Sequence, residues 1–163
     1  MLPTLANISK THELALVDKM DHFESRIAEL PQVYLPLAHW FTDTQFAAIY
    51  LYTRQIFMPA GTIVTSRTHK IRHIFTISQG EFEVMNEKGY VERIIAPHTG
   101  VTFEGTRRVI RIIQDTIWTA SYVTDTKDIE KVAEQVTFTA NSNLPEEFVG
   151  AYKGKPSDIL MPC

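Results

Sequence analysis

The chain has 163 residues, a net charge of −3, 44% hydrophobic residues and 21% charged residues. This length suits one domain with a sizeable core, so we expect a single domain over residues 1–163. The composition excludes a helical membrane protein, because no apolar run approaches the roughly 20 residues that span a bilayer. The one cysteine, Cys163, allows no intramolecular disulfide, and no secretory signal is visible. We therefore expect a cytoplasmic protein that does not bind a membrane.

The charge is unevenly distributed along the chain. Residues 54–111 contain nine Lys or Arg and five Glu, a balance of +4, and the remainder contains seven Lys or Arg and fourteen Asp or Glu, a balance of −7. A basic centre favours an anionic partner, although a solvated basic surface would give the same balance. The segment lacks the dense Lys and Arg run of a duplex-DNA binder, so we expect no duplex nucleic acid as partner.

The apolar periodicity of residues 11–30 predicts a helix. Apolar side chains recur there every three or four positions, which places them on one stripe: Leu16, Met20, Phe23, Ile27 and Leu30. Such a stripe packs against the rest of the domain or against a second copy of the chain.

From residue 45 to residue 124 the pattern changes to the period of two that is typical of strands. The stretch FAAIYLYTRQIFM places Tyr52 and Arg54 on one face. The stretch GTIVTSRTHKIRHIFTISQG, residues 61–80, places six side chains on one face: Arg67, His69, Ile71, His73, Phe75 and Ile77. We expect turns at 79–80 and 114–115 and a hairpin at NEKG, residues 86–89. Strands at this spacing favour an antiparallel sandwich or barrel.

The last quarter of the chain predicts a helix and an arm. Residues 126–136 read as a short amphipathic helix that Asp125 or Thr126 would cap. Residues 137–163 are polar and contain proline, and we expect them to form an extended arm.

The centre of the chain resembles the cupins, a superfamily of small jelly-roll barrels. Their first motif is Gly, five residues, His, one residue, His, three or four residues, Glu, six residues and Gly. This chain keeps that spacing at Gly61, Arg67, His69, His73 and Gly80. Their second motif, Pro-x-Gly-x-x-His, fits at residues 103–108 and places Arg108 at its histidine. The resemblance covers residues 50–124 and implies a mainly β, cupin-like jelly-roll barrel with an N-terminal helix and a short C-terminal helix. The wider pattern is similar to cupin-like proteins that bacteriophages encode, whose roles are mostly unassigned.

The resemblance also implies where a ligand would bind. It puts Arg67, His69, His73 and Arg108 where cupins hold their metal, but arginine stays protonated and has no lone pair to offer. Two guanidinium groups and two imidazoles suit a phosphate or a carboxylate, so we expect a small anionic ligand and no cofactor. Three further side chains are expected at the same pocket, where the aromatic rings could stack on a planar group or simply form core: Arg54, Tyr52 and Tyr122.

Three functions remain open, and the sequence leaves it uncertain whether the protein is an enzyme. The first is a metal-free protein that binds a phosphate-bearing ligand such as a nucleotide. The second is a metal-dependent cupin oxygenase, isomerase or lyase, in which His69, His73 and His98 would hold a divalent transition metal. The third is a structural oligomeric module. Cupin-like barrels commonly pair, so we expect a homo-oligomer, most simply a dimer, in the host cytoplasm if a phage encodes it.

Overall fold

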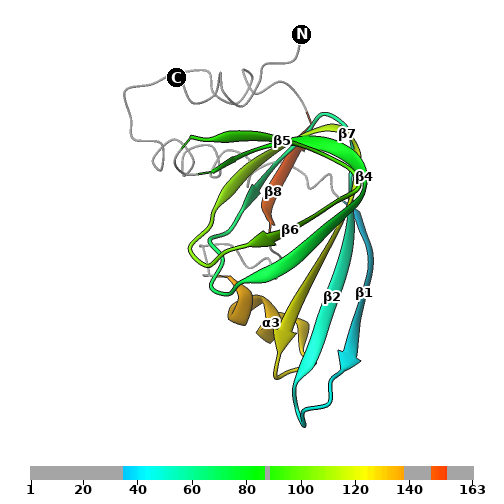
Figure 1. Ribbon diagram of the computed structural model, residues 1–163, viewed down its shortest axis with the longest axis vertical. Helices are drawn as coiled ribbons and strands as arrows, with labels where there is room; N and C mark the ends of the chain where they lie inside the picture. The colour runs from blue at the N-terminus through cyan, green and yellow to red at the C-terminus, as the bar shows by residue number, and fades with distance from the viewer. Residues whose placement is uncertain (1–34, 87–88, 138–147, 154–163) are drawn as a thin grey trace.

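The computed structural model describes residues 35–86, 89–137 and 148–153 (Figure 1). The elements in chain order are β1 (Leu35–Asp43), β2 (Tyr50–Met58), β3 (Thr62–Ser66), β4 (His73–Asn86), β5 (Val91–Ile95), β6 (His98–Thr102), β7 (Arg108–Thr124), α3 (Ile129–Val136) and β8 (Phe148–Lys153). All pairings between these strands are antiparallel. The helix expected over residues 11–30 lies outside the described residues.

Two long strands, β4 and β7, run through both layers of a sandwich (Figure 1). Residues 73–79 of β4 and 116–124 of β7 belong to a first layer with the order β1–β2–β7–β4–β6. Residues 81–86 of β4 and 108–114 of β7 belong to a second layer with the order β8–β3–β7–β4–β5. Two antiparallel layers that share their central strands form a jelly roll. The predicted mainly β jelly-roll fold is therefore confirmed.

The turns expected at residues 79–80 and 114–115 are wrong. Both positions lie inside continuous strands, where the pairing of β4 with β7 shifts register between Ile77 and Phe82. Gly80 has φ of +105°, and a Cβ on it would lie 2.6 Å from the Asp115 carbonyl oxygen. On β7, which pairs with β4 here, the Thr116 hydroxyl donates a hydrogen bond to the Gln114 carbonyl oxygen at 2.7 Å. The glycine thus allows a bulge that bends both strands from one layer into the other.

Other local predictions agree with the structure more closely. The hairpin between β4 and β5 pairs Met85 with Val91, which confirms the turn signal at residues 86–89. The predicted short helix exists, but α3 begins at Ile129, because Asp128 caps it by accepting a hydrogen bond from the Glu130 amide at 3.0 Å. Within the described ranges, no helix is long and apolar enough to cross a bilayer.

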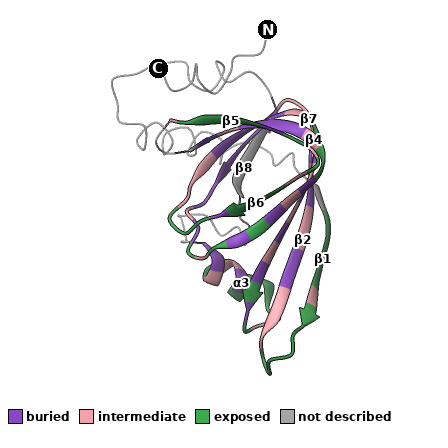
Figure 2. Ribbon diagram, viewed as in Figure 1, coloured by how far each residue is buried: buried purple, intermediate pink, exposed green. Residues whose placement is uncertain are grey.

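The sheets extend beyond the expected barrel of residues 45–124 at both ends. β1 begins at Leu35, and β8, which falls inside the expected arm of residues 137–163, pairs with β3. Buried residues alternate with less buried ones along residues 116–124 of β7, and β2 combines buried and half-buried residues (Figure 2). The buried side chains meet between the layers, and the bulkiest of them are fully enclosed: Trp118, Phe82, Met58, Ile77 and Ile112.

Candidate ligand-binding site

Three basic or imidazole side chains at the end of β3 and the start of β4 are buried, as the alternation predicts: Arg67, His69 and His73. Arg67, His69 and His73 are 4%, 1% and 4% exposed, whereas Lys70 and Ile74 are exposed. Residues 67–72 form a loop and not a strand. Main-chain hydrogen bonds hold this loop in place: the His69 amide donates to the Thr106 carbonyl at 3.1 Å, and the Lys70 amide donates to the Val136 carbonyl of α3 at 2.6 Å.

A row of rings crosses the inner side of the first layer. The ring centroids of His69 and His73 are 4.8 Å apart, and those of His73 and Tyr122 are 4.5 Å apart. Tyr122 in turn stacks at 6.3 Å on Tyr52. The row brings together four of the seven side chains that the sequence assigns to the ligand. The rings pack closely, which also suits the alternative in which the aromatic residues form core.

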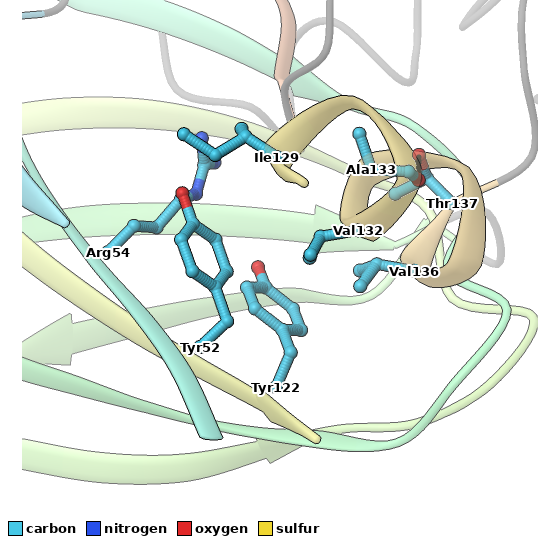
Figure 3. Close-up of a pocket in the computed structure, with 8 residues that line it drawn as sticks. All are labelled: Tyr52, Arg54, Tyr122, Ile129, Val132, Ala133, Val136 and Thr137. Atoms are coloured by element: carbon cyan, nitrogen blue, oxygen red, sulfur yellow. Dashed lines mark hydrogen bonds between the residues drawn. The ribbon is translucent and has the colours of Figure 1, made fainter. Parts of the chain in front are cut away.

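The first hollow lies between the sheet and α3, and we call it the helix hollow (Figure 3). Tyr52, Arg54 and Tyr122 form its strand side, across from Ile129, Val132 and Val136 of α3 (Figure 3). Burial raises the pKa of the Tyr52 hydroxyl above its ordinary value of 10.0, and the nearby positive charge of Arg54 opposes that shift. Tyr52 therefore stays protonated at neutral pH and can donate a hydrogen bond. The volume of this hollow is about 20 Å³, which is room for about one water molecule.

The second hollow is wider, and we call it the strand hollow. Its wall comes from β4, β5, β6 and the start of β7, and its volume is about 360 Å³. The polar side chains that line it include Glu92, His98 and Arg108. Its aromatic lining consists of Phe75, Tyr90 and Phe103. The two hollows share no lining residue.

Phe75 organises the inner wall of the strand hollow. Its ring stacks on Trp118 at 4.6 Å, lies 5.9 Å from the His98 ring, and has the Arg108 guanidinium carbon 5.5 Å from its centroid. A Cβ on Gly100 would lie 2.5 Å from Phe75 Cζ, so the glycine provides the space that this ring occupies. The Arg108 amide donates to the Ser66 hydroxyl at 2.8 Å, which fixes the start of β7. An arginine, an imidazole and an aromatic ring thus meet at one wall.

The structure divides the predicted site residues between these neighbourhoods. Tyr52, Arg54 and Tyr122 line the helix hollow, and Arg108 lines the strand hollow. His98, expected only as a metal ligand, lines the strand hollow too. Glu92 has no place in the predicted site, although it pairs with Val84 across β5 and β4. Period-two alternation with the buried Ile94 could have placed Glu92 on the inner face.

Two other carboxylates of the basic central segment, Glu83 and Glu104, line neither hollow and are paired with arginines. Glu83 forms a buried ion pair with Arg111, with 2.9 Å between the Glu83 Oε2 and the Arg111 Nη2 atoms. Glu104 pairs with Arg72 at 3.1 Å on the surface. In each pair the positive charge of the arginine offsets the negative charge of the carboxylate, so neither glutamate adds a full negative charge to a ligand site.

The histidines do not complete a metal centre within the described ranges. Among residues 35–86, 89–137 and 148–153, no group of three or more His, Cys, Asp or Glu side chains lies close enough to hold a metal ion. His69 and His73 lie side by side, and His98 lies against Phe75. The metal-dependent alternative remains a prediction.

No model of a protein family and no curated protein matches the sequence. Solved structures resemble the fold at low identity. Ectoine synthase from P. lautus is 13% identical with a TM-score of 0.47, over 90% of this chain and 98% of that one. A cupin 2 domain-containing protein from Halorhodospira halophila is 16% identical with a TM-score of 0.43, over 60% and 66%. An RmlC-like cupin from Desulfovibrio desulfuricans is 14% identical with a TM-score of 0.40, over 71% and 96%. The fold assignment rests on the strand pairing of this chain, and phage origin stays a prediction from the sequence.

Proposed function

We propose that the protein binds a small phosphate-bearing ligand, such as a sugar phosphate or a nucleotide, in the strand hollow and without a resident metal. The observation that carries this proposal is the meeting of Arg108, His98 and Phe75 at one wall of that hollow. A guanidinium group presents two parallel N–H donors that match two oxygens of a phosphate. An imidazole donates from one ring nitrogen when neutral and from both when protonated.

Glu92 narrows the class of ligand. Its carboxylate lines the same hollow, accepts hydrogen bonds only and repels an anion. A ligand that satisfies both Arg108 and Glu92 therefore places its phosphate against Arg108. It directs hydrogen-bond donors, such as hydroxyls or an amine, towards Glu92. The exposed rings of Tyr90 and Phe103, 71% and 52% accessible, offer faces on which a planar group could stack. This combination favours a nucleotide or a sugar phosphate over a simple dianion.

The buried basic side chains would act on the ligand from the protein interior, on the far side of the wall that Phe75 forms. His73 occupies the inner position of β4 two residues before Phe75, so it lies next to the wall that Phe75 forms. In this proposal the Arg67 guanidinium raises the electrostatic potential of the interior, which attracts the anion without direct contact.

The proposal can be tested by calorimetry on the full chain with inorganic phosphate, ribose 5-phosphate and AMP, and with adenosine as the uncharged control. We expect ribose 5-phosphate or AMP to bind more tightly than phosphate or adenosine. Arg108→Ala should weaken that binding by about 10- to 150-fold, because it removes a charge-assisted contact of about 1.5–3 kcal/mol. Arg93→Ala is the matched control, because Arg93 is an exposed arginine of β5 that pairs with Glu81 and lines neither hollow.

Each other outcome has a distinct meaning. Equal binding by wild type and Arg108→Ala, together with loss in Arg54→Ala, would move the ligand to the helix hollow and contradict the proposed site. No binding of any phosphate compound would remove the proposal altogether. Near-stoichiometric iron, zinc, nickel or manganese that is lost in His69→Ala or His73→Ala would favour the metal-dependent enzyme, which the 4.8 Å separation of those two rings supports.

A further inference from the structure

The strand hollow opens between the edge strands of the two layers. β5 ends the second layer and β6 ends the first, and both pair with β4 on the side that faces away from β7 (Figure 1). Residues of both edge strands line the hollow, together with Phe75 and Val84 of β4. Its volume of about 360 Å³ lies within the range of cavities that hold small organic ligands. A ligand of the size of a mononucleotide therefore suits this hollow.

One side of β5 presents an aromatic ring and a carboxylate next to each other. Tyr90 directly precedes β5 and Glu92 lies within it, and both line the strand hollow. Residues two apart on an extended chain share a face, with about 6.6 Å between their Cα atoms. Ile94, the next residue of that face, is 7% exposed. A planar group that stacks on the Tyr90 ring would therefore direct one edge towards Glu92.

The carboxylate of Glu92 is available to a ligand. The carboxylates of Glu81, Glu83 and Glu104 pair with arginines. In the part of the chain that the structure describes, Glu92 has no such partner. An ionised carboxylate accepts hydrogen bonds at both oxygens and donates none. The edge of a base that lies against Glu92 must therefore supply donors.

The common bases differ in the donors of their base-pairing edge. Guanine presents two adjacent donors, N1–H and the N2 amine, which match the two oxygens of a carboxylate. Adenine and cytosine present an amine beside an accepting ring nitrogen, and uracil presents one N–H between two carbonyl oxygens. Each of these three would place an acceptor against a carboxylate oxygen, and such a mismatch costs affinity. We propose, resting on the function proposed above, that Glu92 binds the base-pairing edge of guanine and that the ligand is a guanine nucleotide.

The strand register separates the two ends of this ligand. Glu92 pairs with Val84, and Val84 pairs with Ile110, so Glu92 and Arg108 lie two strands and two residues apart. At about 4.8 Å between strands and 3.3 Å per residue, their Cα atoms are about 12 Å apart. The Arg108 guanidinium lies over Phe75, across the hollow from β5. The base and the phosphate thus engage separate side chains, and neither a free base nor a free phosphate engages both.

The test is calorimetry on the full chain with GMP, IMP and AMP, and with ribose 5-phosphate as the ligand that lacks a base. The wild type should bind GMP about 5- to 150-fold more tightly than AMP, the discrimination that a bidentate contact to a base provides. IMP keeps N1–H but lacks the N2 amine, so its affinity should lie between the two.

Glu92→Gln should reverse the order of GMP and AMP. Glutamine offers one acceptor and one donor, which match the amine and the ring nitrogen of adenine and oppose one donor of guanine. A residue with a merely structural role would not exchange one preference for the other. Glu130→Gln is the matched control, because Glu130 is exposed on α3 and lines neither hollow. It should leave GMP preferred.

The outcomes separate this inference from the proposed function. Equal binding of GMP and AMP by the wild type, with ribose 5-phosphate still bound through Arg108, would overturn the guanine assignment and leave the proposed function standing. A preference for GMP that survives in Glu92→Gln would overturn it as well. Loss of binding of all four compounds would contradict both. Glu92 is exposed, so we expect the variant to fold, and thermal unfolding checks this. If it folds poorly, Glu92→Ala decides, because it should lose the preference for GMP without gaining affinity for AMP.

Discussion

Tyr52 couples the stability of the protein to pH. Its side chain is 6% exposed, and burial raises its pKa above the ordinary value of 10.0 against the opposing charge of Arg54. The folded protein therefore holds this proton more tightly than the unfolded chain does. The resulting contribution to stability is fully present below pH 10 and is lost as pH rises through the folded-state pKa.

Tyr52→Phe should remove this dependence, because phenylalanine has no proton to lose. The free energy of unfolding in urea, measured below and above pH 10 for wild type and variant, gives the comparison. We expect the stability of the wild type relative to Tyr52→Phe to fall as pH rises above 10. A relative stability that rises over the same interval would show that Arg54 outweighs burial.

The burial of individual site residues could be predicted only where the alternation of the sequence determines which face of the strand a side chain occupies. The burial of Arg67, His69 and His73 follows from a period of two that the sequence displays. The place of Arg108 over Phe75 does not, since these residues lie on strands far apart along the chain. Alternation with the buried Ile94 indicates the face that Glu92 shares, but its place in the same hollow as Arg108 depends on the pairing of β4 with β5, which no local signal gives.

Gly80 determines how two elements bend together. Its φ of +105° suits glycine, and a Cβ would lie 2.6 Å from the backbone of Asp115 and of Thr116. Gly80→Ala should therefore lower the free energy of unfolding by about 3 kcal/mol or more, combining backbone strain with overlap. Gly105→Ala is the control, because Gly105 has φ of +77° and no atom within 4 Å of its added Cβ. That change should cost about 1–2 kcal/mol. Equal losses in urea unfolding would argue against close approach of β4 and β7.

The same glycine shows why the sequence misplaced two turns. Glycine and aspartate mark chain reversals and bulges alike, so the local signal at residues 79–80 and 114–115 does not distinguish them. The distinction depends on the partner strand: β4 continues past Gly80 because β7 runs alongside it on both sides of the bulge. The hairpin at residues 86–89 was predictable because a short polar loop between alternating runs rarely has another meaning.

At the scale of the whole molecule, β4 and β7 make the two layers one cooperative unit. Each strand contributes one half to each layer, and both line a common core that contains Phe82, Ile112 and Trp118. Neither layer can separate without unpairing strands of the other. We therefore expect the described sandwich to unfold in a single two-state transition.

Trp118 provides the probe for this prediction. It is 2% exposed, stacks on Phe75 at 4.6 Å and lies 5.4 Å from Phe82, so its fluorescence reports the contact between the layers. The other tryptophan, Trp40, is 45% exposed on the outer face, and Trp40→Phe leaves Trp118 as the sole tryptophan. In that variant, urea unfolding followed in one sample by tryptophan fluorescence and by far-ultraviolet circular dichroism should give the same midpoint. A fluorescence change that precedes the loss of strand signal would mean that the layers part before their strands unpair, and the shared strands would then not couple them.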